Sequence, residues 1–176
     1  MTIHSEHPFL QPEQERDPAR RLRGRLGSTV TLWTVGSGPD RVGLTVSSHM
    51  VAGGEPARIL ALVDPDSDLR EGLEEHGRAV VQLLGWAHRD LADAFAGVAP
   101  APGGPFRAAE FEDTSWGPRL ADATTWAGVS LESVVPVGWS DLVTCVLEEV
   151  TIGDDVAPLT HRRGRYVRPP GAEDMA

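Results

Sequence analysis

The sequence predicts a mainly β protein, a closed antiparallel barrel with a Greek-key-like course and a few short helices. Many segments are short, rich in β-branched and aromatic residues, and bounded by Gly, Pro or Asp, which is typical of strands. Only a few short segments have the apolar spacing of a helix. Strands and helices do not alternate regularly along the chain, and this argues against a doubly wound parallel sheet.

Composition indicates one globular domain. The 176-residue chain is 40% hydrophobic and 24% charged, and it is long enough for a sizeable core. We assign the domain to residues 17–168, with flexible tails over 1–16 and 169–176. The net charge of −10, with Arg as the only fixed cation, argues against a nucleic-acid partner. No apolar run is long enough for a membrane helix, and the single cysteine, Cys145, favours the cytoplasm.

The first elements are a short helix and a hairpin. The helix is expected over 17–26, because Asp17 is a suitable N-cap and a proline follows it. Strands over 29–35 and 41–47 flank a turn rich in Gly and Pro at 36–40, so the two strands should pair.

The second strand of this hairpin has a polar side. Because side chains alternate along a strand, Leu44 and Val46 should face a core while Thr45 and Ser47 face the other way. Ser48 then turns outward as the strand ends. Hydroxyls and amides at a strand end suit a polar-edged ligand or a phosphate, although an ordinary half-exposed strand has the same pattern.

The rest of the chain continues the mixture of strands and short helices. Leu69 and Leu73 are four residues apart with Gly77 as a cap, which predicts a helix, and Leu91 and Phe95 predict a second. The expected elements are strand 57–64, helix 66–76, strand 78–84, helix 88–96, strands 124–137 and 142–152, and a short strand 164–167.

The residues reveal neither a catalytic nucleophile nor a metal site. Cys145 lies inside an expected strand, where a buried and inert thiol is the usual state. His4 and His7 form an H-x-x-H pattern, but no cysteine or third ligand lies near them, so no metal site is expected.

Five segments together carry a resemblance to a known family. They are Gly-Leu-Thr-Val-Ser-Ser at 43–48, Asp-Ser-Asp-Leu at 66–69, Gly-Arg-Ala-Val-Val-Gln-Leu-Leu at 77–84, Leu-Ala-Asp-Ala-Phe-Ala-Gly at 91–97 and His-Arg-Arg-Gly-Arg-Tyr at 161–166. Their order and spacing resemble the flavin reductase-like, FMN-binding split-barrel family over residues 17–168. The resemblance implies a split β-barrel and a homodimer with flavin near the subunit interface.

The resemblance also implies where the flavin would lie. Thr45, Val46, Ser47 and Ser48 match the family's segment that meets the flavin ring edge and phosphate. His49 follows this segment, either as a surface histidine or as a group that stacks on or hydrogen-bonds to the ring.

A second family segment departs from its usual pattern. Relatives hold the phosphate there with cations and a serine, whereas this chain keeps Ser67 but has Asp66 and Asp68 around it. Acidic residues at this position also suit a helix start. The alternatives are that other residues bind the phosphate, or that the ligand is held differently; Arg70 either folds back or is solvated.

Four more residues are site candidates by resemblance. Gln82 replaces a family Asn and either contacts the ring or pairs with neighbouring backbone, and His88 replaces a frequent Gln. His161 is a candidate near the nicotinamide, and Arg165 is a candidate cofactor ligand or part of a solvated basic face. Phe95 is expected in the core.

The resemblance implies reduction of FMN or FAD by NADH or NADPH, with a flavin-dependent monooxygenase as a candidate partner. Residues 138–141 read Gly-Trp-Ser-Asp where relatives often have Gly-Asp-His, which puts nicotinamide reduction in question more than flavin binding. The alternatives are a binding protein for flavin, deazaflavin or haem without reductase activity, and a dimeric interaction module.

Overall fold

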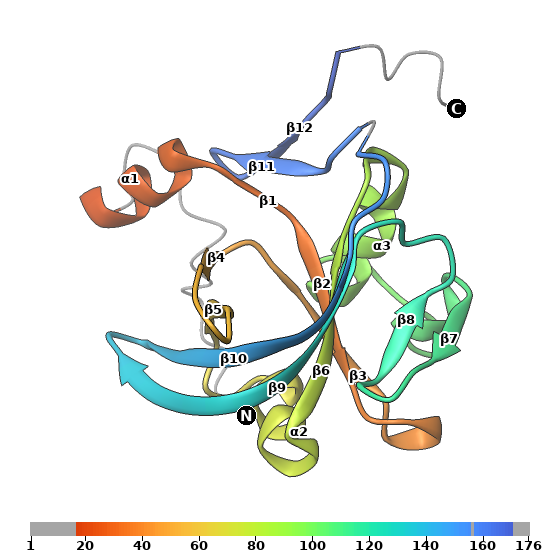
Figure 1. The fold of residues 1–176 in the computed structure, drawn as a ribbon. Helices are drawn as coiled ribbons and strands as arrows, with labels where there is room; N and C mark the ends of the chain where they lie inside the picture. The colour runs from red at the N-terminus through yellow and green to blue at the C-terminus, as the bar shows by residue number, and fades with distance from the viewer. Residues whose placement is uncertain (1–16, 156, 171–176) are drawn as a thin grey trace, which may run out of the picture.

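The computed structural model describes residues 17–155 and 157–170, and one curled seven-stranded antiparallel sheet forms its centre (Figure 1). In sheet order the strands are β3 (Val42–Val46), β2 (Thr31–Val35), β6 (Arg78–Leu83), β9 (Trp126–Val137), β10 (Ser140–Thr151), β5 (Arg58–Val63) and β4 (His49–Ala52). The edge strands β3 and β4 are consecutive in the chain, separated by Ser47 and Ser48. Within the described residues no ladder pairs β3 with β4, so the expected closed barrel is observed as a curled open sheet.

Three short α-helices accompany the sheet: α1 (Pro18–Leu26), α2 (Asp68–His76) and α3 (Arg89–Phe95). Asp17 caps α1, Ser67 caps α2 by accepting from the Arg70 N–H, and Gly77 ends α2 in a left-handed conformation. No helix in the described part of the chain is long and apolar enough to cross a membrane. Three 3₁₀ turns complete the helical segments: η1 (Gly38–Asp40), η2 (Trp86–His88) and η3 (Pro105–Arg107).

Two hydrophobic clusters cover opposite faces of β2, and all five residues of that strand are buried. Trp33 and Val35 belong to the cluster inside the curled sheet, against which Leu44 and Val46 pack as predicted. Leu32 belongs to the second cluster, together with residues of α3 that include Phe95. The expected core position of Phe95 is therefore confirmed.

A small three-stranded sheet lies at the end of the molecule opposite α2 (Figure 1). It consists of β1 (Ser28–Thr29), β11 (Thr160–Arg162) and β12 (Arg165–Val167). Arg163 and Gly164 connect β11 to β12 with positive φ angles of 54° and 77°, the backbone that a tight hairpin requires.

The expected elements agree with the structure to within two residues at either end, apart from the strand at 29–35, which divides at Val30. The Val30 N–H donates to the carbonyl of Leu159, and the Val30 carbonyl accepts from the N–H of Leu84, so this residue leaves the main ladder. The sequence did not predict β4, β11 or the hairpin of β7 (Phe111–Asp113) and β8 (Pro118–Leu120), each of three or four residues. The assigned tails lie mostly outside the described residues.

Candidate functional site

The sheet register brings several expected site segments to one end of the molecule. Val46, the last residue of β3, pairs with Thr31, and Thr31 pairs with Leu83, the last residue of β6. His161 pairs with Ser28, just before β2. The ends of β3 and β6 and the β11 segment therefore surround the same region.

Ser47 and Ser48 form the link between the two edge strands of the sheet. The Ser48 carbonyl accepts a hydrogen bond of 2.9 Å from the Leu62 N–H, which ties the link to β5. Both serines are half-buried. Neither hydroxyl bonds to another described residue, so both are available to a ligand.

The neighbouring residues Thr45 and Val46 are committed to the fold. The Thr45 hydroxyl donates to the Ala92 carbonyl of α3 at 2.6 Å, because α3 packs on the face of β3 that Thr45 occupies. Val46 is buried, and its carbonyl accepts from the Thr31 hydroxyl at 2.8 Å. The Thr45 hydroxyl proton is therefore already engaged within the fold, and the Val46 side chain has no polar atom to offer a flavin.

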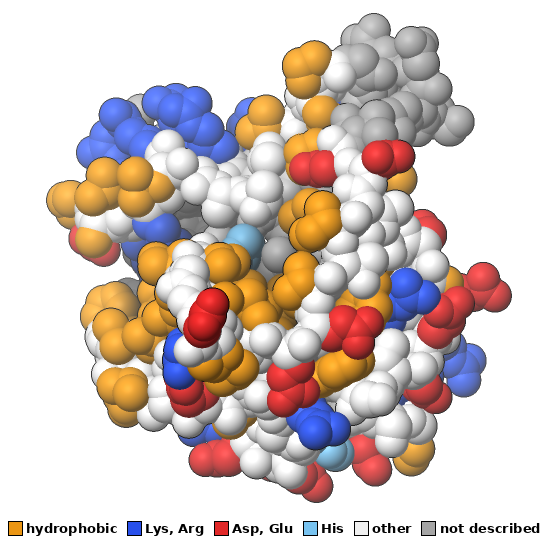
Figure 2. Space-filling view, viewed as in Figure 1, with side chains coloured by type: hydrophobic (Ala, Val, Ile, Leu, Met, Phe, Trp, Pro, Cys, Tyr) orange, Lys and Arg blue, Asp and Glu red, His pale blue; other side chains and the backbone are white. Residues whose placement is uncertain are grey.

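A recess lies between β4 on one side and α1 with β11 on the other. His49 and Val51 share the inner face of β4, since their cross-strand partners Ala61 and Ile59 both belong to the core. Val51 is nevertheless 64% exposed, so nothing in the described structure packs over this part of β4. The space-filling view shows the hollow, with a histidine at its wall (Figure 2).

His49 is half-buried within this recess rather than a free surface residue. Its Nε2–H donates to the Thr29 carbonyl at 3.1 Å, which joins β4 to β1. Burial lowers the pKa of His49, and the hydrogen bond to Thr29 opposes this only in part. The ring is therefore neutral at physiological pH, with Nε2 carrying the proton.

His161 and Arg165 lie on the β11–β12 hairpin. Arg165 is exposed, whereas His161 is half-buried and stacks edge-on against Tyr166 with ring centroids 5.8 Å apart. The Tyr166 hydroxyl donates to Asp93 at 2.8 Å and fastens the hairpin to α3. Burial and the positive charge of Arg23 lower the pKa of His161, so this imidazole is also neutral.

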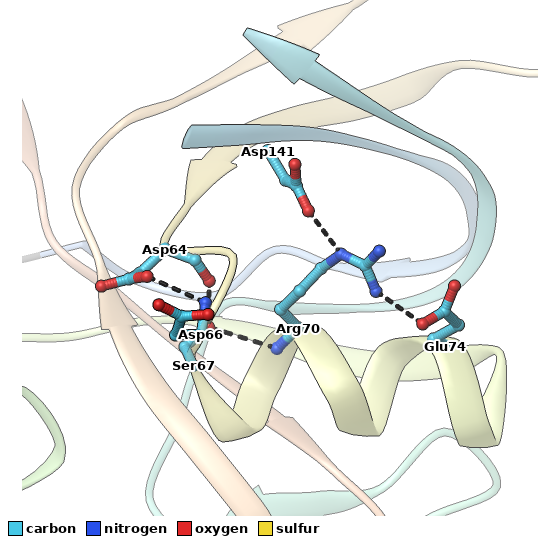
Figure 3. Close-up of polar contacts among 6 residues, drawn as sticks. All are labelled: Asp64, Asp66, Ser67, Arg70, Glu74 and Asp141. Atoms are coloured by element: carbon cyan, nitrogen blue, oxygen red, sulfur yellow. Dashed lines mark hydrogen bonds and ion pairs between the residues drawn. The ribbon is translucent and has the colours of Figure 1, made fainter. Parts of the chain in front are cut away.

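The segment before α2 does not provide a cationic phosphate site (Figure 3). Asp64 accepts the Asp66 N–H at 2.9 Å, and the Ser67 hydroxyl donates to the Asp64 carbonyl at 2.7 Å. Arg70 neither folds back onto this segment nor extends into solvent. Its Nε donates to Asp141 at 2.8 Å and its terminal nitrogen to Glu74 at 3.0 Å.

Gln82 is a buried structural amide. Its side chain is fully buried, its Nε2 donates to the Thr34 hydroxyl at 3.1 Å, and its Oε1 accepts from the Leu120 N–H at 2.6 Å. These contacts favour the alternative of internal pairing over a contact with a flavin ring. One partner is a side chain of the adjacent strand β2, and the other is a backbone N–H of β8.

His88 belongs to a separate cavity. This cavity, of about 690 Å³, lies between α3 and the segment 99–109, with Arg107 and Asp122 among its lining residues. The His88 Nδ1 accepts from the Gly85 N–H, and the Nε2 lies 3.1 Å from Asp122. None of the residues 45–48 lines this cavity, so the structure does not unite His88 with the serine link.

The chemistry of the candidate site is therefore binding and positioning rather than acid–base catalysis. Cys145 is buried, which raises the pKa of its thiol to about 12, in keeping with the expected inert state. The hydroxyls of Ser47 and Ser48 and two neutral imidazoles suit the polar edge of a flavin. The acidic residues before α2 do not suit its phosphate.

Sequence reasoning missed Val51 and the contribution of Thr29 and Arg23 to the surroundings of the two histidines. Local alternation does not show that the face of β4 bearing Val51 stays uncovered, since that depends on where α1 and β11 are placed. The run of arginines at 20–25 is the sequence feature that could have indicated a role for α1 in the site.

Comparison with known proteins identifies the family to which this chain is similar. Residues 23–169 match the family model described as flavin reductase like domain. The FMN reductase (NADH) RutF of Serratia proteamaculans (strain 568) is 25% identical over 166 residues, which cover 94% of this chain and 94% of the relative.

Two solved structures share the fold. The NADH:FAD oxidoreductase SgcE6 of Streptomyces globisporus C-1027 has a TM-score of 0.78 at 21% identity, over 92% of this chain and 97% of that one. BorF, the flavin reductase component of a bacterial two-component tryptophan halogenase, has a TM-score of 0.75 at 23% identity, over 86% and 98%. Because the family model spans most of the sequence and these folds agree with it, the chain belongs to the family of flavin reductase-like domains.

Proposed function

We propose that this protein reduces FMN or FAD with a nicotinamide nucleotide, NADH or NADPH. The observation that carries the proposal is the family match over residues 23–169, combined with two serine hydroxyls at the link between β3 and β4 that bond to no described residue. The relative from Serratia is named an FMN reductase that uses NADH, which supports FMN and NADH as the first pair to test. We also propose that the sheet forms a split barrel whose two edge strands, β3 and β4, meet at the Ser47–Ser48 link.

The flavin, when bound, supplies the ring that accepts the hydride. The chain has to hold that ring so that the nicotinamide approaches to about 3–3.5 Å. Ser47 and Ser48 would bind the polar edge of the ring, and the recess beside His49 and Val51 would exclude water from one side. Because His49 and His161 are neutral, neither adds a charge beside the ring.

The test is an FMN and FAD titration of the full-length protein, followed by NADH and NADPH oxidation in the same cuvette. Tight binding with turnover supports the proposal and identifies the nucleotide. If the protein binds neither flavin, the family relationship gives the fold and not the function.

Replacing one hydroxyl tests the placement of the flavin. Ser47→Ala should weaken FMN binding by about 1 kcal/mol, because one hydrogen bond to the ligand is lost. Ser37→Ala is the matched control, since Ser37 is an exposed serine whose side chain makes no capping bond. Unchanged FMN affinity in a correctly folded Ser47→Ala protein would remove Ser47 from the site.

A second candidate is a flavin carrier without reductase activity. It is favoured by Asp141, which belongs to the segment where relatives often have Gly-Asp-His. Residues 138–141 contain no histidine, and the Asp141 carboxylate is held by Arg70 and only 8% exposed, so this segment offers little to a nicotinamide. Stopped-flow mixing of the flavin complex with NADH distinguishes the two, because a carrier would leave the nicotinamide unoxidised.

We also propose a cytoplasmic homodimer that supplies reduced flavin to a partner monooxygenase. One outer face of the sheet carries an apolar row, since Leu62 pairs with Leu142 and Leu142 with Val135. Leu62 is 40% exposed and Val135 is 50% exposed, with Met50 of the adjacent strand at 68%. Sedimentation should give twice the monomer mass, and Leu62→Glu should shift the protein to monomer.

A further inference from the structure

One end of this acidic protein is strongly basic. Seven of its 16 arginines lie on α1 or on the β11–β12 hairpin and an eighth, Arg168, directly follows β12, although the net charge of the chain is −10. Figure 2 shows the blue side chains gathered over α1. We call this group the arginine surface; its members are Arg20, Arg21, Arg23, Arg25, Arg162, Arg163, Arg165 and Arg168.

Hydrogen bonds to main-chain carbonyls of α1 hold these like charges together. The Arg163 N–H donates to the Gly24 carbonyl at 2.8 Å, which docks the β11–β12 turn on α1. The Arg162 Nε donates to the Arg25 carbonyl at 3.3 Å. Two basic segments that are far apart in the sequence thus form one surface despite their mutual repulsion.

Among the described residues, no ion pair with a carboxylate neutralises the arginines at the centre of this surface, and the nearby Asp93 carboxylate accepts a hydrogen bond from Tyr166. Elsewhere, arginines pair with acids, as Arg58 does with Glu132 and Arg70 with Asp141. Within the described residues, five members of the arginine surface have no ion pair or side-chain hydrogen bond: Arg21, Arg23, Arg25, Arg163 and Arg165. All five are exposed, so an anion from outside the chain can reach them.

The arginine surface is continuous with the candidate flavin site. Arg23 lies close enough to His161 to lower the pKa of that imidazole. His161 pairs with Ser28, and the next residue, Thr29, accepts the hydrogen bond from His49, which directly follows the serine link. A ligand whose ring lies at Ser47 and Ser48 would therefore extend toward arginine.

The opposite direction is unsuitable for the charged part of such a ligand. Asp64 and Asp66 lie in the segment directly before α2, and Arg70 is already bound by Asp141 and Glu74 (Figure 3). A phosphate placed there would meet carboxylates, whereas guanidinium groups bind phosphate oxygens through two parallel hydrogen bonds.

We propose that the arginine surface binds the phosphate groups of a nucleotide whose ring lies at the Ser47–Ser48 link. The anion is either the phosphate of the flavin or the diphosphate of the nicotinamide nucleotide, and both offer the same chemistry to the arginines. This inference rests on the proposed function, and it adds to that function the residues that take the charge.

The test uses the full-length protein with Arg23→Gln and Arg165→Gln combined, and Arg78→Gln as the control. Arg78 is also exposed, but it begins β6, at the end of that strand remote from the serine link. The ligands are riboflavin, FMN, FAD, NADH and reduced nicotinamide riboside, which lacks the diphosphate. Dissociation constants are read from flavin or nicotinamide fluorescence.

A flavin source predicts that the double variant binds FMN or FAD about tenfold more weakly while riboflavin affinity stays unchanged, since two charge-assisted contacts are lost. If the arginines instead bind the diphosphate of the nicotinamide nucleotide, the double variant should bind NADH about tenfold more weakly. Its affinity for flavins and for reduced nicotinamide riboside should then stay unchanged. Either result supports the inference, provided that Arg78→Gln binds every ligand as the wild type does.

Equal affinities of the double variant and the wild type for every phosphate-bearing ligand would overturn the inference. An equal loss of riboflavin and FMN would also overturn it, because the arginines would then act through the fold. Where the wild type binds no flavin, the proposed function fails separately. Calorimetry with inorganic pyrophosphate then decides the inference: binding abolished in the double variant supports it, and absence of binding to the wild type overturns it.

Discussion

Gln82 offers a sharp test of which polar groups hold the fold and which serve the ligand. In Gln82→Leu the side chain keeps a similar volume but loses its hydrogen bonds to Thr34 and Leu120 and a longer one to Pro118. The buried Leu120 N–H is left without its acceptor, which costs about 1–3 kcal/mol, and the lost bond to Thr34 costs about 0.5–1.5 kcal/mol more. We therefore expect the free energy of unfolding to fall by about 2–4 kcal/mol.

The assay is urea unfolding followed by tryptophan fluorescence, with a flavin titration on the same sample below the unfolding transition. Thr34→Val alone and combined with Gln82→Leu completes a double-mutant cycle, and the coupling energy should be about 1 kcal/mol. The structural reasoning is refuted if Gln82→Leu unfolds within about 0.5 kcal/mol of the wild type. A large loss of flavin affinity without a loss of stability would instead place Gln82 at the ring.

Three further predictions concern packing, reactivity and pH. Gly128→Ala should lower the free energy of unfolding by about 1–3 kcal/mol in urea, because the new Cβ would lie 2.3 Å from the ring of Trp116; unchanged stability would mean that the ring moves freely. The Cys145 thiol, with its pKa raised to about 12, should not react with Ellman's reagent until the protein unfolds. Burial lowers the pKa of His49, so the unfolded chain takes up the proton first and stability should fall as the pH drops below about 6.5. Comparing urea unfolding of the wild type and His49→Gln at about pH 7.5 and pH 5.5 checks this, since the variant should lose less stability.

Strands and helices with strong local signals were predictable from the sequence. Leu44 and Val46 face the core as their alternation predicts, and α2 ends at His76 with Gly77 as its cap, as expected. The helix begins at Asp68, two residues later than expected, with Ser67 as its N-cap. The missed strands β4 and β11 are three or four residues long and carry polar or exposed side chains. Such strands are stabilised by the neighbour they pair with, which a local pattern does not reveal.

The candidate site was predictable only in part. Alternation correctly turns Thr45 away from the core, but it does not say that α3 covers that face and takes the hydroxyl. The acidic residues before α2 are visible in the sequence, whereas the capture of Arg70 by Asp141 joins residues 71 positions apart. Contacts of this kind depend on the tertiary arrangement, so no local pattern contains them.

The two-residue link between β3 and β4 has a consequence for dynamics. The sheet has two free edges, and they meet where the ligand is expected to bind. A ligand held there would stabilise the closed arrangement of these edges by mass action, to an extent set by its concentration relative to its dissociation constant. Backbone amides of β3 and β4 should then exchange with solvent more slowly in the complex, while those of the central strand β9 keep their rate. The bound ligand would hold the edge strands β3 and β4 together, and the local separation of these strands would limit the rate at which the ligand dissociates.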